Sequence, residues 1–113
     1  APSPPTIEIT KPRCGKIYLW NKEIFPFPLG TIVIGPISIE ADASDKDGSI
    51  ERVEFFVNNV SVFNDTEAPY RYTINEQMFG FCTVKVIAYD DSGMKAEDST
   101  RFFMINFGIV KLD

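Results

Sequence analysis

The chain has 113 residues, of which 44% are hydrophobic, and this is typical of one domain that buries a single apolar core. Sixteen acidic residues against eleven basic ones give a formal net charge of −5, which argues against a nucleic-acid-binding surface, since such a surface needs clustered Lys and Arg. Histidine is absent, which removes the commonest general base and zinc ligand and argues against an enzyme, and no apolar stretch is long enough for insertion into a membrane.

Short runs in which apolar and polar residues alternate recur along the chain, and each run predicts a β-strand. These runs occupy residues 6–10, 16–20, 30–34, 37–43, 51–57, 60–63, 70–74, 81–90 and 99–107. Turn signals separate the runs, and the pair Asn58-Asn59 favours a tight hairpin because Asn tolerates positive φ. Strands at this spacing, with no helical period between them, are typical of an all-β antiparallel sandwich of about seven strands. Ile39, Phe55 and Val86 are expected to share its dry interior.

A long insertion at residues 17–34 separates the first and second core strands and is rich in aromatic residues and proline. Its aromatic residues are Tyr18, Trp20, Phe25 and Phe27. If these side chains are exposed, they form a patch for a neighbouring domain, a glycan or a protein. In the alternative that we favour, the insertion folds back over the outer face of a sheet, where Phe56, Ile87 and Tyr89 face away from the core, because an open patch of that size promotes aggregation.

Acidic residues gather in two turns, one after the run at 37–43 and one after the run at 81–90. The first turn region contains Asp42, Asp45 and Asp47, and the second contains Asp90 and Asp91. In an antiparallel sandwich of this kind, these two turns are expected to lie at the same end. Converging carboxylates supply the oxygen ligands that calcium prefers, so calcium is the one candidate cofactor. The alternative is that Asp side chains only stabilise the turns through local hydrogen bonds.

Two pairs of residues are candidates for covalent modification. A disulfide between Cys14 and Cys82 would close a long loop and contribute roughly 3–4 kcal/mol, and the alternative is two buried thiols that act as small apolar side chains. The tripeptides that begin at Asn59 and Asn64 match the acceptor pattern for N-glycosylation. The alternative for this region is an unmodified polar turn.

Three motifs occur together between residues 37 and 93. They are Ala-x-Ala-x-Asp-x-Asp-Gly-x-Ile-x-x-Val-Glu-Phe-x-Val at 41–57, Ala-Pro-Tyr at 68–70 and Val-Lys-Val-Ile-Ala-Tyr-Asp-Asp-Ser-Gly at 84–93. In this combination and order the chain resembles the bacterial and archaeal immunoglobulin-like domains of surface and secreted proteins. The resemblance implies a seven-stranded sandwich, exposure outside the cell, and a role as a spacer, an adhesion unit or an accessory domain of a secreted hydrolase.

The leading hypothesis is that residues 6–107 form a non-catalytic extracellular or cell-surface module, with a linker remnant at 1–5 and a tail at 108–113. Such a module spaces, stabilises or anchors a larger protein, and its partners are the neighbouring domains. The alternative is a carbohydrate- or protein-binding module that uses the insertion at 17–34. A carboxylate hydrolase that uses a pair such as Glu51 and Glu54 is disfavoured, because a short sandwich loop offers no apolar cleft to raise the pKa of an acid.

Overall fold

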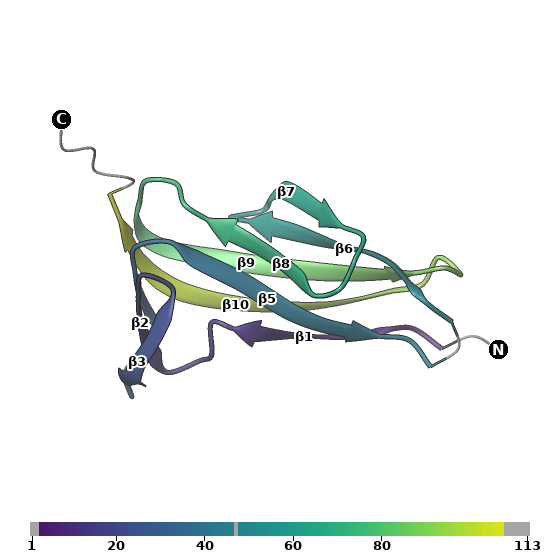
Figure 1. Ribbon diagram of the computed structural model, residues 1–113, viewed down its shortest axis with the longest axis horizontal. Helices are drawn as coiled ribbons and strands as arrows, with labels where there is room; N and C mark the ends of the chain where they lie inside the picture. The colour runs from purple at the N-terminus through teal and green to yellow at the C-terminus, as the bar shows by residue number, and fades with distance from the viewer. Residues whose placement is uncertain (1–2, 47, 108–113) are drawn as a thin grey trace.

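The computed structural model describes residues 3–46 and 48–107, and every regular element in this part of the chain is a β-strand (Figure 1). The ten strands are β1 (Thr6–Lys11), β2 (Lys16–Leu19), β3 (Lys22–Pro26), β4 (Ile32–Ile34), β5 (Ile37–Ser44), β6 (Ile50–Val57), β7 (Val60–Asp65), β8 (Tyr70–Ile74), β9 (Met78–Asp90) and β10 (Lys95–Asn106). These residues contain no helix that is long and apolar enough to cross a membrane. The predicted tail at 108–113, and residues 1–2 of the predicted linker, lie outside the described residues.

The strands form two facing sheets of unequal size. The smaller sheet has the order β1-β5-β8, and the larger has the order β3-β2-β4-β10-β9-β6-β7. Most neighbours run antiparallel, but β4 runs parallel to both β10 and β2. The all-β sandwich is therefore confirmed, with ten strands rather than about seven, because the insertion contributes strands of its own to the larger sheet.

The core lies between the two sheets and follows the period of two along each long strand. Ile39 of the smaller sheet and Phe55 and Val86 of the larger sheet have no exposed surface, as predicted. Side chains of this size each contribute roughly 1.5–3 kcal/mol when they are fully buried. The hairpin between β6 and β7 is also confirmed, since Asn58 and Asn59 adopt φ angles of 50° and 69° at its two central positions.

The strand β3 was not predicted, because Pro26 argues against a central strand. The structure resolves this conflict by placing β3 at the outer edge of the larger sheet, where only β2 pairs with it. At an edge the missing N–H of proline costs no ladder hydrogen bond on the open side. Proline is therefore tolerated in β3 because β3 is an edge strand, whereas a central strand would exclude it.

The predicted fold-back of the insertion over the outer face of a sheet is wrong. Strands β2 and β3 extend the larger sheet sideways beyond β4, so they do not cover the face that carries Phe56 and Tyr89. Long cationic side chains of the same sheet cover these rings instead: the Arg52 guanidinium lies 3.8 Å from the Tyr89 ring centre, and the Lys85 ammonium lies 4.7 Å from that of Phe56. Apolar stems and cation–π contacts thus protect the face without a second layer.

Candidate functional site

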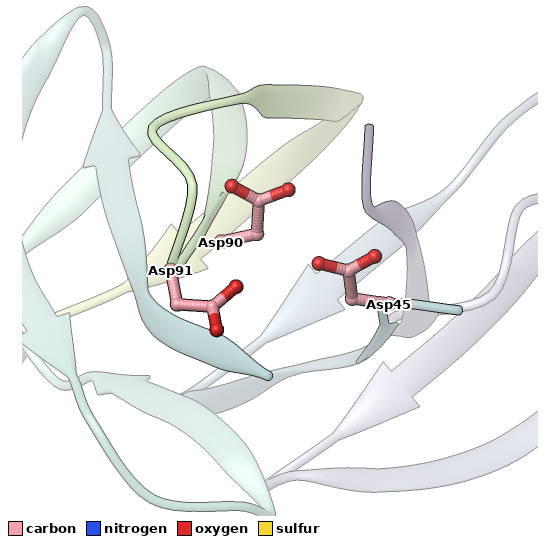
Figure 2. A group of neighbouring side chains, drawn as sticks. All are labelled: Asp45, Asp90 and Asp91. Carbon is pink, nitrogen blue, oxygen red and sulfur yellow. The ribbon is translucent and has the colours of Figure 1, made fainter. Parts of the chain in front are cut away.

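Three of the five predicted acidic residues come together where β5 and β9 end (Figure 2). Asp45, Asp90 and Asp91 each offer a carboxylate oxygen, and these oxygens all lie within 4.8 Å of one another. Asp42 is not part of the group, because it is exposed on β5 and lies opposite Glu8 of β1. Asp47 lies outside the described residues. Whether the group binds calcium stays a prediction at this point.

The turn between β9 and β10 is built around Asp90. One carboxylate oxygen, Asp90 Oδ1, accepts hydrogen bonds from the Ser92 amide at 2.9 Å, the Ser92 hydroxyl at 2.8 Å and the Met94 amide at 2.8 Å. The Asp90 amide donates to the Met94 carbonyl at 3.0 Å, and Gly93 supplies the φ of 90° that the turn needs. These bonds hold the Asp90 side chain in one orientation.

Asp90 is a buried carboxylate with one satisfied and one unsatisfied oxygen. It is only 2% exposed, and Asp90 Oδ2 accepts no hydrogen bond from the residues that the structure describes. Burial raises the pKa of Asp90, but the hydrogen bonds from Ser92 and Met94 outweigh burial and hold the pKa below its ordinary value. The group is therefore ionised at neutral pH, with a negative charge close to Asp45 and Asp91.

The two acidic turns also touch through their backbones. The Asp91 amide donates to the Ser49 carbonyl at 3.1 Å. A Cβ atom added to Gly48 would lie 2.5 Å from Asp91 Oδ1, so the Asp91 carboxylate occupies the space that any other residue at position 48 would fill. Glycine at this position therefore lets the two turns approach closely.

The four aromatic residues of the insertion do not form one surface. Tyr18 is 2% exposed and belongs to the core, so its predicted role in partner binding is wrong. Its hydroxyl accepts a hydrogen bond from the Arg13 amide at 2.7 Å and donates to Glu23 at 3.2 Å, which satisfies the polar end of a buried ring. Phe27 is half-buried, whereas Trp20 and Phe25 are 66% and 55% exposed.

A second exposed aromatic group was missed by the sequence analysis. Phe79 and Phe81 of β9 are 71% and 63% exposed, and both meet the Phe103 ring of β10 edge to face at 5.6 and 5.2 Å. The signal was present in the sequence, since Phe79 and Phe81 alternate with the inward-facing Cys82 and its neighbours. Leu29, 86% exposed, lies beside this group and lines a shallow depression with Phe81 and Phe103.

The predicted disulfide is wrong, because both cysteines are free. Cys82 faces the core opposite Phe102, and burial raises the pKa of its thiol to about 11. Cys14 lies in the exposed turn after β1, with its sulfur 3.9 Å from the Thr100 hydroxyl oxygen. The alternative of buried, inert thiols therefore holds for Cys82 alone.

Both candidate glycosylation residues lie at the exposed edge formed by β7. Asn59 occupies the hairpin turn, and the Asn64 side-chain oxygen accepts a hydrogen bond from Arg52 at 3.1 Å. Neither position is buried, so the geometry permits modification. Glycosylation at these two residues stays a prediction.

Comparison with known sequence families identifies the domain. The sequence profile of a family described as bacterial Ig domain matches residues 28–101. The chain belongs to the bacterial immunoglobulin-like domain family. The matched segment runs from the end of the insertion into β10 and includes all three sequence motifs, so the resemblance drawn from the motifs is confirmed. The chain matches none of the curated proteins with which it was compared.

Solved structures agree with this assignment of the fold. The fibronectin(III)-like modules of Clostridium thermocellum CbhA are 32% identical with a TM-score of 0.69, over 91% of this chain and 47% of that one. An endo-beta-1,4-mannanase from Thermotoga petrophila shares the fold at 13% identity and a TM-score of 0.64, over 92% of this chain and 20% of that one. An engineered protein does so at 15% identity and a TM-score of 0.55, over 92% and 21%. This immunoglobulin-like domain thus spans about half the length of the CbhA structure.

Proposed function

We propose that this immunoglobulin-like domain is a non-catalytic, extracellular module that spaces and stabilises a larger protein. The observation that carries the proposal is its shape. The described chain measures 55 × 35 × 21 Å, and strand β1 begins at the opposite end of the long axis from the point where β10 ends (Figure 1). Segments joined to these two ends are held apart by the long axis of the domain, which acts as a rod.

Similarity to longer proteins supports the same role. The match to the CbhA modules covers nearly all of this chain but less than half of that structure, as expected for one unit of a multidomain protein. A location outside the cell is proposed by analogy, since domains of this family commonly occur in surface and secreted proteins. The acidic net charge of −5 is compatible with a soluble exposed module.

Small-angle X-ray scattering on two copies of residues 1–113 joined in tandem tests the spacer role. We expect a maximum dimension roughly twice that of one copy, because each copy enters at one end and leaves at the other. A tandem protein with the dimension of two rods packed side by side contradicts the proposal. The location is tested separately by adding a protease to intact cells of the source organism: an extracellular module is digested, and an internal one survives.

A second candidate function is binding through the β2–β3 hairpin. It is favoured by the exposed apolar side chains on this hairpin, namely Trp20, Ile24 and Phe25 at 66%, 44% and 55%. Rings of this kind stack on sugars or on apolar protein surfaces. A glycan array and a pull-down from the medium of the source organism test the idea with Trp20→Ala. Phe107→Ala, which changes a ring of similar exposure at 68%, is the matched control. Binding that survives Trp20→Ala, or is lost equally in both variants, rejects this function.

A further inference from the structure

Among the described residues, Asp90 Oδ2 is the one buried side-chain nitrogen or oxygen atom without a hydrogen bond. Buried polar atoms are nearly always satisfied, and an ionised oxygen without a partner is especially unfavourable. The turn has already placed three donors on Oδ1, so Oδ2 is the oxygen left for a ligand. A bound cation would supply the missing partner.

The charges of the neighbouring side chains also favour a bound cation. Figure 2 shows the carboxylates of Asp45, Asp90 and Asp91 close together between the end of β5 and the β9–β10 turn. Three negative charges at this separation repel one another when nothing lies between them. A cation placed between the carboxylates would relieve this repulsion.

We infer that Asp45, Asp90 and Asp91 bind one calcium ion, which fastens the turn after β5 to the turn after β9. All of the donors are carboxylate oxygens, and an oxygen-only set selects a hard cation over zinc or copper. Asp45 and Asp91 are at least partly exposed, which gives the ion a route from solvent and leaves room for water ligands.

Coordination geometry favours calcium over magnesium. Two oxygens on one ion lie no further apart than twice the metal–oxygen distance, about 4.6–5.2 Å for calcium and about 4.0–4.2 Å for magnesium. The three oxygens lie within 4.8 Å of one another, a spacing that is compatible with one calcium ion. Magnesium also demands near-octahedral geometry, which three carboxylates on two separate turns do not provide without rearrangement.

Titration calorimetry with CaCl2 on the chelator-treated protein tests the inference. We expect one binding site, and we expect Asp45→Asn and Asp91→Asn each to weaken calcium binding roughly tenfold or more, because each removes a charged ligand and keeps its size. Asp42→Asn is the matched control, since it removes the same charge from the same end of β5 but lies outside the group. It is expected to leave the affinity within about twofold of the parent chain.

Thermal unfolding gives a second readout that does not depend on heat of binding. Calcium must raise the unfolding temperature with increasing concentration, since it binds the folded state alone. Circular dichroism of each variant without calcium confirms that it is folded. The inference is overturned if no binding occurs at millimolar calcium, if Asp42→Asn loses as much affinity as Asp45→Asn, or if MgCl2 stabilises the protein as well as CaCl2 does.

Discussion

Glu54 connects the side chains on the outer face of the larger sheet. It accepts hydrogen bonds from the Ser61 hydroxyl at 2.6 Å and the Tyr89 hydroxyl at 2.9 Å, and the Arg52 guanidinium lies 3.8 Å away. The bond from Ser61 is the largest cause that lowers the pKa of Glu54; burial acts in the opposite direction, and Tyr89 and the cations Arg52 and Lys85 add to the lowering. One carboxylate thus joins β6, β7 and β9.

This lowered pKa makes the stabilisation by Glu54 depend on pH. A carboxyl group whose pKa is lower in the folded state contributes stability above its unfolded pKa, and the contribution is lost as pH falls through the folded pKa. We expect Glu54→Gln to reduce the free energy of unfolding by about 1 kcal/mol at pH 7, and the difference from the parent chain to shrink in acid. Urea unfolding from pH 7 to pH 3 measures this. Parallel stability curves for the two proteins contradict it, and Ser61→Ala is expected to move the acid loss to higher pH.

Phe55 is one of the largest side chains that the core buries completely. It has no exposed surface, and its ring lies 6.3 Å from the rings of Phe63 and Tyr72. Phe55→Ala is expected to cost roughly 3–5 kcal/mol of unfolding free energy, because it leaves a cavity between the sheets. Phe63→Ala removes an equal ring that is 42% exposed and must cost clearly less. Equal losses in urea unfolding would mean that Phe55 is not a core residue.

The candidate cation site shows what residue patterns can predict. The acidic turns after β5 and β9 were found from the sequence, and the rule that they lie at one end of a sandwich brought Asp45 near Asp90. Asp42 was wrongly included, although strand alternation already placed it on the face toward solvent. The orphaned Asp90 Oδ2 was beyond prediction, because it depends on how the turn distributes its donors between two oxygens.

At the scale of elements, the long hairpin of β9 and β10 extends further than its apolar pattern. The apolar runs predicted strands at 81–90 and 99–107, but the ladder continues from Lys95 opposite Tyr89 to Asn106 opposite Met78. Residues 95–98 are mostly polar, so the sequence has no alternating apolar residues there that would predict a half-buried strand. Backbone pairing across a tight turn extends the strands there, and hydrophobic periodicity does not report such pairing.

The β2–β3 hairpin depends on a turn that the sequence does not reveal. Trp20 and Asn21 adopt φ angles of 46° and 69°, and a bulky residue rarely occupies this region. The Trp20 amide donates to the Ile34 carbonyl at 2.8 Å, and its ring lies over Gly35. The contact between the Trp20 ring and Gly35 therefore positions the hairpin, because a glycine has no side chain to occupy the space of the ring.

Gly35→Ala tests this contact. The added Cβ would lie 2.9 Å from Trp20 Cδ2, and the φ of 84° also disfavours alanine, so we expect a loss of about 1–3 kcal/mol. Trp20 is the single tryptophan, so its displacement must also change the fluorescence spectrum. Gly93→Ala is the matched control, because φ is 90° there and nothing lies within 4 Å of the added Cβ. If Gly35→Ala leaves the folded-state spectrum unchanged, the ring does not depend on this space.

For the whole molecule, the two sheets are joined by more than apolar packing. The Asp98 carboxylate of β10 accepts a hydrogen bond from the Ile9 amide of β1 at 2.9 Å, so an edge strand of the smaller sheet is tied directly to the larger one. The buried side chains of both sheets form one continuous cluster. The rod that separates the two ends of the domain is therefore held together by its core and by hydrogen bonds between the sheets.

Because this core contains no disulfide, the stability of the whole domain must be independent of redox conditions. A reductant removes no constraint from the unfolded chain when Cys14 and Cys82 are both free, so thermal unfolding is expected at the same temperature with and without it. Cys14→Ser changes an exposed side chain and is expected to be neutral. Cys82→Ser places a hydroxyl in the core and is expected to cost about 1–3 kcal/mol. Two results together would contradict this arrangement of the two thiols. Reductant would lower the unfolding temperature of the parent chain, and the Cys14→Ser variant without reductant would show the same lowered temperature. Such a pair of results would reveal a disulfide.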